Sequence, residues 1–294
     1  GQITSALAYV TSEDMPVFYT LEGQDELPLS TAFQNGLEKQ NAQLQSINLL
    51  TQESVPEDAQ GVLIMAPVTD ISADDADKLI AYLDKGGKIL MTTAYMEDFA
   101  EEMPNLQKVL DYFGLAIEKG LVMEGDSSMY YQQPAYLLPD VAYDTLTKGI
   151  SGEKYIFMPY AQGIKKTDDV RDTVTINSLL TTSDSAYSKV DVNSGAIEKN
   201  DDDIDGPFDL GVSITETLDD DKETQIVYYT SSNLMDSQIN QMVSGGNEQM
   251  IMSSLSWMCS SDETSTISVP SKNLQISYLT LTAYDVSFWK IMVM

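Results

Sequence analysis

The chain has 294 residues, 43% of them hydrophobic, and a formal net charge of −30 from 46 acidic and 16 basic residues. This is enough for one large or two smaller domains. The charge argues against binding to nucleic-acid phosphates or anionic lipid headgroups. The chain has no histidine and one cysteine, Cys259, which excludes Ser-His-Asp and Cys-His catalytic groups, His-ligated zinc and an intrachain disulfide.

The first part of the chain has the pattern of an α/β sheet. Apolar spacing predicts a buried strand at 6–11, a helix at 29–40, a strand at 44–50, a helix at 104–113 and an extended segment at 115–124. The stretch between the first strand and the first helix is expected to be a polar loop.

The clearest unit is 61–93, GVLIMAPVTDISADDADKLIAYLDKGGKILMTT. Its apolar run Val62–Ala66 is typical of a strand covered on both faces. Ser72 and Asp75 form a capping-box pattern at the start of a helix, and the pair Gly86–Gly87 favours its end. Strand, helix and strand joined by short loops predict two parallel strands with a right-handed crossover.

The second half predicts additional β structure around an acidic segment, 191–221. Strands are expected at 155–164, 173–182, 206–217 and 224–232, a last helix at 247–261, and another strand within the tail. We therefore expect an α/β half at 1–125, a β-rich half at 126–264 that completes the same domain, and a tail at 265–294.

One stretch, DDDIDG, resembles the first half of a calcium-binding loop. Asp201, Asp203 and Asp205 alternate before Gly206, but position 12 of the pattern is Val212 instead of the bidentate Glu. The stretch is either a calcium site or a solvated acidic loop.

Ligands of open α/β sheets bind at the carboxyl ends of the strands. No Gly-rich phosphate loop follows any predicted strand, so a nucleotide is not expected. The tyrosines, especially Tyr130, Tyr131 and Tyr136, could stack on sugar rings or serve in ordinary packing. The predicted strand ends offer hydroxyls and carboxylates that could bind a sugar or a cation: Ser12, Glu13, Thr69, Asp70, Tyr95 and Glu97.

Several segments in order resemble the GldG-like ABC-transporter auxiliary family. They include ALAYVT, the unit 61–93, YIFMPYAQGI, GPFDLGVSI, IVYYTSSNLMD and GGNEQMIMSSLSWMCSSDETSTI. The resemblance implies an open, mostly parallel sheet flanked by helices, of the flavodoxin or glutamine amidotransferase type. It does not imply amidotransferase activity, which needs a nucleophilic cysteine at a strand-to-helix elbow and a histidine partner.

The resemblance also gives a meaning to the end of the sequence, SFWKIMVM. A transmembrane helix would begin near Phe288, with Trp289 and Lys290 at the interface. The alternative is an amphipathic segment that packs on the domain.

The resemblance implies a non-enzymatic domain at the cell membrane, on its extracytoplasmic side. It would belong to an ABC-transporter accessory protein and bind permease or ATPase components, or an exported or cell-surface ligand. We expect no cofactor, except for the calcium possibility. The alternatives are a soluble glycan- or calcium-binding module and, disfavoured by the missing histidine, a hydrolase or amidotransferase.

Overall fold

The computed structural model describes residues 15–39, 41–168, 170–195, 197–218 and 222–260. The strand expected at 6–11, the tail strand, the membrane helix expected from Phe288, and the predicted site residues Ser12 and Glu13 lie outside these residues. Within the described residues, no helix is both long enough and hydrophobic enough to cross a bilayer.

A ten-stranded sheet forms the centre of the protein, in the order β2-β1-β3-β4-β15-β14-β10-β5, with β11 and β8 joined beside β14. The strands β2, β1, β3, β4 and β15 are parallel, and the others are antiparallel. The strands are β1 Val17–Leu21, β2 Gln43–Ile47, β3 Ala59–Met65, β4 Lys88–Thr92, β5 Leu115–Ile117, β8 Asp140–Val141, β10 Ile164–Lys166, β11 Val174–Thr181, β14 Asp209–Thr217 and β15 Glu223–Tyr229. The expected α/β class is confirmed.

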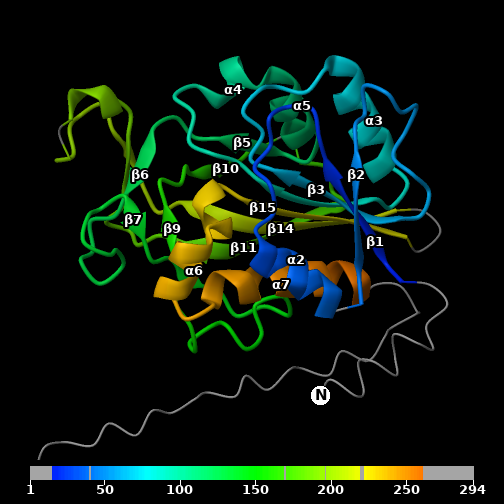
Figure 1. Ribbon diagram of the computed structural model, residues 1–294. Helices are drawn as coiled ribbons and strands as arrows, with labels where there is room; N and C mark the ends of the chain where they lie inside the picture. Colours follow the sequence, from blue (N-terminus) through cyan, green and yellow to red (C-terminus); the bar gives the residue numbers. More distant parts are fainter. Residues whose placement is uncertain (1–14, 40, 169, 196, 219–221, 261–294) are drawn as a thin grey trace, which may run out of the picture.

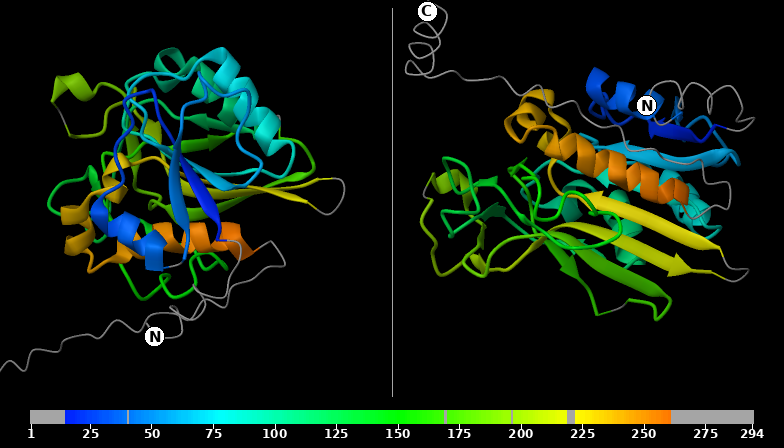
Figure 2. Two further views of the ribbon diagram at one scale, coloured as in Figure 1. Left: turned by 45° about the vertical axis from the view of Figure 1, so that its right-hand side comes forward. Right: turned by 90° about the horizontal axis from the view of Figure 1, so that it is seen from below.

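Helices cover both faces of this sheet (Figure 1). One layer contains α3 Ala73–Leu83, α4 Phe99–Glu102 and α5 Pro104–Tyr112; the other contains α2 Thr31–Lys39, α6 Ser237–Met242 and α7 Gly246–Ser260. Figure 2 shows α7 lying lengthwise under the strands with α2 next to it, and the two helices are in contact.

Alternating side chains of the strands supply two hydrophobic cores, one on each face. In β4, Ile89 and Met91 join the core beneath α3 and α5, whereas Leu90 joins the core against α2 and α7. A central parallel strand therefore needs apolar residues at consecutive positions, as the run in 61–93 indicates.

The predicted unit 61–93 is confirmed as β3–α3–β4, with β3 and β4 parallel. Ser72 Oγ accepts from Asp75 N at 3.0 Å, and Asp75 Oδ2 accepts from Ser72 N at 3.4 Å, so the capping box is present. Gly86 has a φ of 89°, a conformation that glycine adopts without steric cost.

The structure corrects three sequence-based expectations. Strand β1, Val17–Leu21, lies in the stretch expected to be a polar loop. The single strand expected at 155–164 is divided into β9 Met158–Pro159 and the start of β10, because Tyr160 takes a positive φ of 56° between them. The extended segment 115–124 is divided in the same way at Gly120, with a φ of 91°.

Two small sheets extend from one side of the main sheet (Figure 1). One contains β6 Leu121–Met123, β12 Tyr187–Lys189 and β13 Ile204–Asp205, and the other contains β7 Tyr136–Leu137 and β9. Short 3-10 helices lie at Val192–Ser194 and Ser232–Met235.

Candidate functional site

The carboxyl ends of β1, β3, β4 and β15 meet at one edge of the sheet, where ligands bind in open α/β folds. Backbone hydrogen bonds connect the loops that follow these strands. Leu27 N donates to Met65 O at 2.9 Å, and Met65 pairs in register with Thr92. Val68 N donates to Gln24 O at 2.9 Å. The loop after β1 therefore crosses the ends of β3 and β4.

Glu26 holds this crossing loop in shape. Its Oε2 accepts from Gly23 N at 3.1 Å and from Gln24 N at 3.0 Å. Gly23 has a φ of 125°, which the turn requires and which side chains rarely adopt. The carboxylate thus uses one oxygen to fix the backbone, while the other, Oε1, is buried without a partner among the described residues.

Around this edge, four buried side-chain oxygens lack a hydrogen-bond partner among the described residues: Gln24 Oε1, Glu26 Oε1, Ser30 Oγ and Thr92 Oγ1. Gln24 is 5% exposed and Thr92 only 1%. An unpaired buried polar group reduces stability by about 1–3 kcal/mol, so native proteins rarely retain one without a reason. All four oxygens can accept hydrogen bonds, and the Ser30 and Thr92 hydroxyls can also donate one; a group rich in donors, such as an ammonium, a guanidinium or an amide, can satisfy all four. We call these four residues the acceptor site.

The surroundings of the acceptor site are acidic and partly apolar. The segments that follow the four strands, 22–30, 66–72, 93–98 and 230–236, together contain seven acidic residues and no lysine or arginine. Leu27 and Val68 are exposed next to them, Val68 by 61%. A basic group with an apolar stem matches this surface in charge and in hydrophobicity.

The turn after β3 has the backbone strain that often marks a functional site, but it carries no cysteine. Ala66 is buried and has a φ of 46°, which is uncommon for a residue with a side chain. Cys259 lies far along α7, whose Met258 O accepts from Lys88 Nζ at the amino end of β4. The thiol is therefore at the opposite edge of the sheet from the acceptor site.

The predicted residues Thr69, Asp70, Tyr95 and Glu97 all follow β3 or β4, at this edge of the sheet. Asp70 caps α5, because its carboxylate accepts from Asn105 N at 2.9 Å and from Leu106 N at 3.0 Å.

Tyr95 and Thr69 make contacts with neighbouring parts of the fold. Tyr95 packs against the core of the small sheet around β6. Burial raises the pKa of Tyr95, and the charge of Glu97 raises it further. Thr69 is exposed and donates its backbone N–H to Gln24 O at 3.2 Å.

The sequence analysis misses Gln24, Glu26 and Ser30 because it misses β1, and it misses Thr92 because only the folded structure shows that this strand hydroxyl is buried without a partner among the described residues. With Val17–Leu21 assigned as a strand, 22–30 is recognisable as a strand-end loop.

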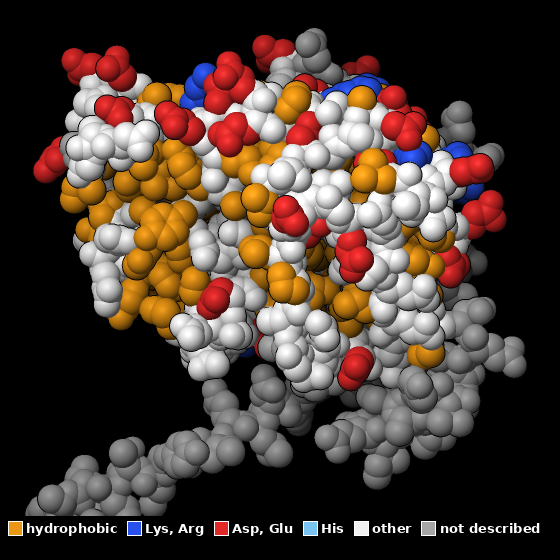
Figure 3. All heavy atoms as spheres, turned by 45° about the horizontal axis from the view of Figure 1, so that its top comes forward, with side chains coloured by type: hydrophobic (Ala, Val, Ile, Leu, Met, Phe, Trp, Pro, Cys, Tyr) orange, Lys and Arg blue, Asp and Glu red, His pale blue; other side chains and the backbone are white. Residues whose placement is uncertain are grey.

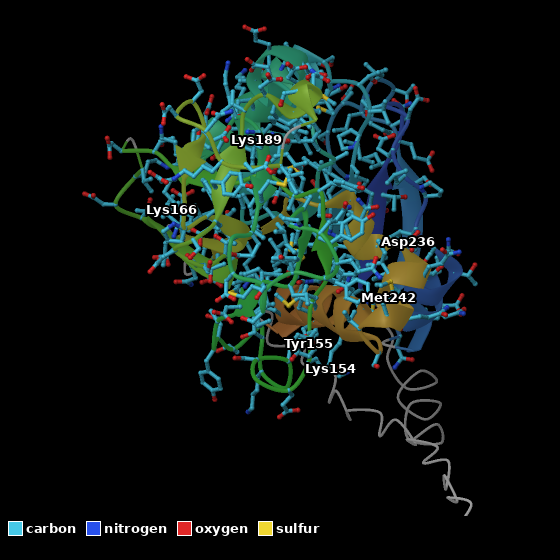
Figure 4. The ribbon with its side chains drawn as sticks, turned by 90° about the vertical axis from the view of Figure 1, so that its left-hand side faces the viewer. Lys154, Tyr155, Lys166, Lys189, Asp236 and Met242 are labelled. Carbon is cyan, nitrogen blue, oxygen red and sulfur yellow. The ribbon has the colours of Figure 1, made fainter. Side chains whose placement is uncertain are left out.

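The alternating aspartates 201, 203 and 205 are not brought together as metal ligands. Asp203 is buried and forms an ion pair with Lys189 Nζ at 2.9 Å; Asp205 pairs with Lys199; Asp201 is exposed. Figure 4 shows Lys189 among the strands of the small sheet. Among the described residues, no group of three Cys, Asp or Glu side chains is placed to hold a metal ion. Calcium binding stays a prediction that this geometry does not favour.

Burial alone would raise the pKa of Asp203. Hydrogen bonds from Asn200 N, Lys189 and Val190 N outweigh that effect and keep the pKa of Asp203 below its usual value. Asp203 is therefore ionised and acts as an internal anchor for the acidic loop.

Comparisons with known proteins locate the fold but not a family. No family model and no curated protein matches the chain. Among solved structures, the mmIFT52 N-terminal domain is similar with a TM-score of 0.60 and 13% identity, over 85% of this chain and 100% of that one. This level of identity shows a shared fold alone.

Two further solved structures are similar at a lower TM-score. They are PurLQS from Thermotoga maritima (TM-score 0.43, 12% identity, 83% of this chain and 99% of that one) and a ThuA-like protein from Parabacteroides merdae (TM-score 0.44, 11% identity, 87% and 93%). The fold assignment therefore rests on the strand order described above and on the mmIFT52 domain.

Proposed function

We propose that this chain is a non-enzymatic binding domain of a membrane-anchored ABC-transporter accessory protein, and that it binds a basic segment of a partner protein at the acceptor site. The observation that carries the proposal is the group of unpartnered buried oxygens at the carboxyl edge of the sheet. They match hydrogen-bond donors that the described part of the chain does not itself supply there.

The absence of catalytic chemistry supports the non-enzymatic part. The full sequence has no histidine, and its one thiol lies at the far edge of the sheet from the strained turn at Ala66. A cysteine nucleophile with a histidine base is the arrangement that an amidotransferase-like reaction requires.

The transporter part rests on the sequence resemblance. The last described helix, α7, ends at Ser260 near the amino edge of the sheet, since Gln60 and Lys88 both donate to Met258 O. If the chain enters a membrane from Phe288, its attachment begins at the edge opposite to the acceptor site. The acceptor site would then be free to meet a partner.

The test uses the full-length protein, purified from its own membranes in mild detergent. We expect ABC permease or ATPase components to copurify with it, and less of them to copurify as salt increases, because the interacting charges become screened.

A double variant, Gln24→Met with Thr92→Val, keeps the side-chain volumes and removes two acceptors. It should reduce copurification at least tenfold. Recovery of the wild-type protein without any ABC component would contradict the transporter assignment. Equal recovery with wild type and variant would contradict the role of the acceptor site.

A further inference from the structure

One surface of this acidic chain has no charge. The segments 127–139 and 155–164 contain no Asp, Glu, Lys or Arg, although 21% of the chain is charged and about five such residues would be expected in their combined length. In Figure 3, hydrophobic side chains gather on the side of the molecule that carries β7 and β9, beneath a rim of acidic residues.

Strand pairing and backbone hydrogen bonds join these two segments into one unit. Tyr136 pairs with Pro159 and Leu137 pairs with Met158 in the β7–β9 sheet. Tyr160 N donates to Ala135 O at 3.0 Å and Tyr131 N donates to Tyr136 O at 2.8 Å. The surface is therefore organised before any ligand arrives.

Three tyrosine rings stand on this unit: Tyr131 and Tyr136 pack against the buried ring of Phe157, and Tyr160 packs against Tyr136. The Tyr136 ring contacts two other rings edge to face, with centroid distances of 5.8 Å to Phe157 and 5.5 Å to Tyr160. The Tyr131 ring contacts Phe157 in the same way, with a centroid distance of 6.1 Å. Tyr131 is 43% exposed and Tyr160 is 42% exposed. Large parts of these two rings are available to a ligand. We call Tyr131, Tyr136, Tyr160 and the intervening exposed Gln132 and Gln133 the tyrosine platform.

The backbone is strained where it presents these side chains. Gln132 has a φ of 64° and Tyr160 a φ of 56°. A positive φ is unusual for glutamine and more so for a bulky tyrosine, and it reduces the stability of the fold. Strain of this kind persists where the surrounding structure holds it, and it is concentrated at binding sites.

We propose that the tyrosine platform binds a neutral carbohydrate. Exposed aromatic faces pack against the C–H groups of a sugar ring, while phenol and amide groups donate to and accept from its hydroxyls. The absence of charge in both segments matches an uncharged ligand and contrasts with the acidic acceptor site, which suits a basic one. This inference does not depend on the proposed transporter role.

The test uses the 294-residue chain and neutral oligosaccharides, first on an array and then in solution by calorimetry. We expect at least one neutral glycan to bind. Tyr131→Ala and Tyr160→Ala should each weaken that binding about three- to tenfold, the range expected for one lost aromatic contact. Tyr160→Phe should retain most of the affinity, since it keeps the ring.

Tyr143→Ala is the matched control, because Tyr143 is 85% exposed and lies outside the platform. It should bind glycans as the wild type does. Circular dichroism should show that all variants are folded. Failure of every neutral glycan to bind, or binding that survives both alanine substitutions, would overturn the proposal. Binding of a proline-rich peptide to the platform in place of glycans would also overturn it.

Discussion

Two adjacent threonines test whether the acceptor site is unpaired in the folded protein. Thr92 and Thr93 are both buried, at 1% and 2% exposure. Thr93 Oγ1 shares a 2.7 Å hydrogen bond with Tyr228 OH, whereas Thr92 Oγ1 has no partner among the described residues. Valine has nearly the same shape as threonine, so each Thr→Val change reports mainly on the hydroxyl.

The two substitutions should have opposite effects. Removing an unpaired buried hydroxyl relieves a penalty of about 1–3 kcal/mol, so we expect Thr92→Val to raise the free energy of unfolding by about 1–2 kcal/mol. Thr93→Val leaves the Tyr228 hydroxyl buried without its partner and should lower the free energy of unfolding by about 1–2 kcal/mol.

The assay is urea unfolding of the wild type and both variants, followed by circular dichroism. Equal slopes would show that the midpoints report stability alone. If Thr92→Val destabilises the protein by as much as Thr93→Val does, the Thr92 hydroxyl is paired in solution and the reasoning behind the acceptor site fails. A gain in stability combined with a loss of partner binding would be the signature of a functional site.

Three further substitutions and one ligand test probe the rest of the structure. Lys189→Met should lower the free energy of unfolding by about 3–5 kcal/mol, because it leaves the Asp203 carboxylate buried without its cation. Urea unfolding measures this change, and a loss below about 1 kcal/mol would contradict the buried ion pair. Asp70→Ala should lower it by about 1–2 kcal/mol through the lost α5 cap, and a neutral result would show that water replaces the carboxylate. Millimolar calcium should leave the melting temperature unchanged, and a calcium-dependent rise would revive the metal hypothesis. Burial would raise the pKa of Glu216, but hydrogen bonding by Arg171 keeps this pKa low. Arg171→Gln should therefore reduce the fall in melting temperature that acid causes. If the melting temperature of this variant depends on pH as that of the wild type does, the Arg171–Glu216 pair is not the cause of the fall.

The sign of the acid effect follows from the direction of the pKa shift. Because the pKa of Glu216 is lower in the folded state, its pairing stabilises the fold above the unfolded-state pKa of about 4.3. That stabilisation is lost as the pH falls through the lower, folded-state pKa. Asp203 should behave in the same direction, since its pKa is also lowered.

The sequence predicts best those elements whose signals are local. The unit β3–α3–β4 is defined by an apolar run, a capping box at Ser72 and a helix stop at Gly86, all within a few residues of the boundaries that they set. β1, Val17–Leu21, is mostly apolar, yet the pattern does not single it out, because ALAYVT at 6–11 is an equally good strand to precede the first helix. Apolar composition alone does not say which run pairs with β3.

The candidate site could be predicted only in part for the same reason. Its position at the strand ends follows from the fold class, but its members depend on contacts between distant segments. Asp70 carries a carboxylate of the kind that binds ligands, but it caps α5, because α5 begins beside it in the folded chain. Thr92 is of a residue type that is common in strands, and only the folded structure shows that its hydroxyl is buried without a partner among the described residues.

The most direct test of the central claim is site-specific photocrosslinking of the full-length protein in the cells that produce it. A photoreactive phenylalanine analogue at Val68 would lie beside the acceptor site, and the same group at Tyr112, at the end of α5, would lie near the amino edge of the sheet. We expect crosslinks to an ABC-transporter component from position 68 and none to that component from position 112. Crosslinks from position 112 alone, or from neither position, would contradict it.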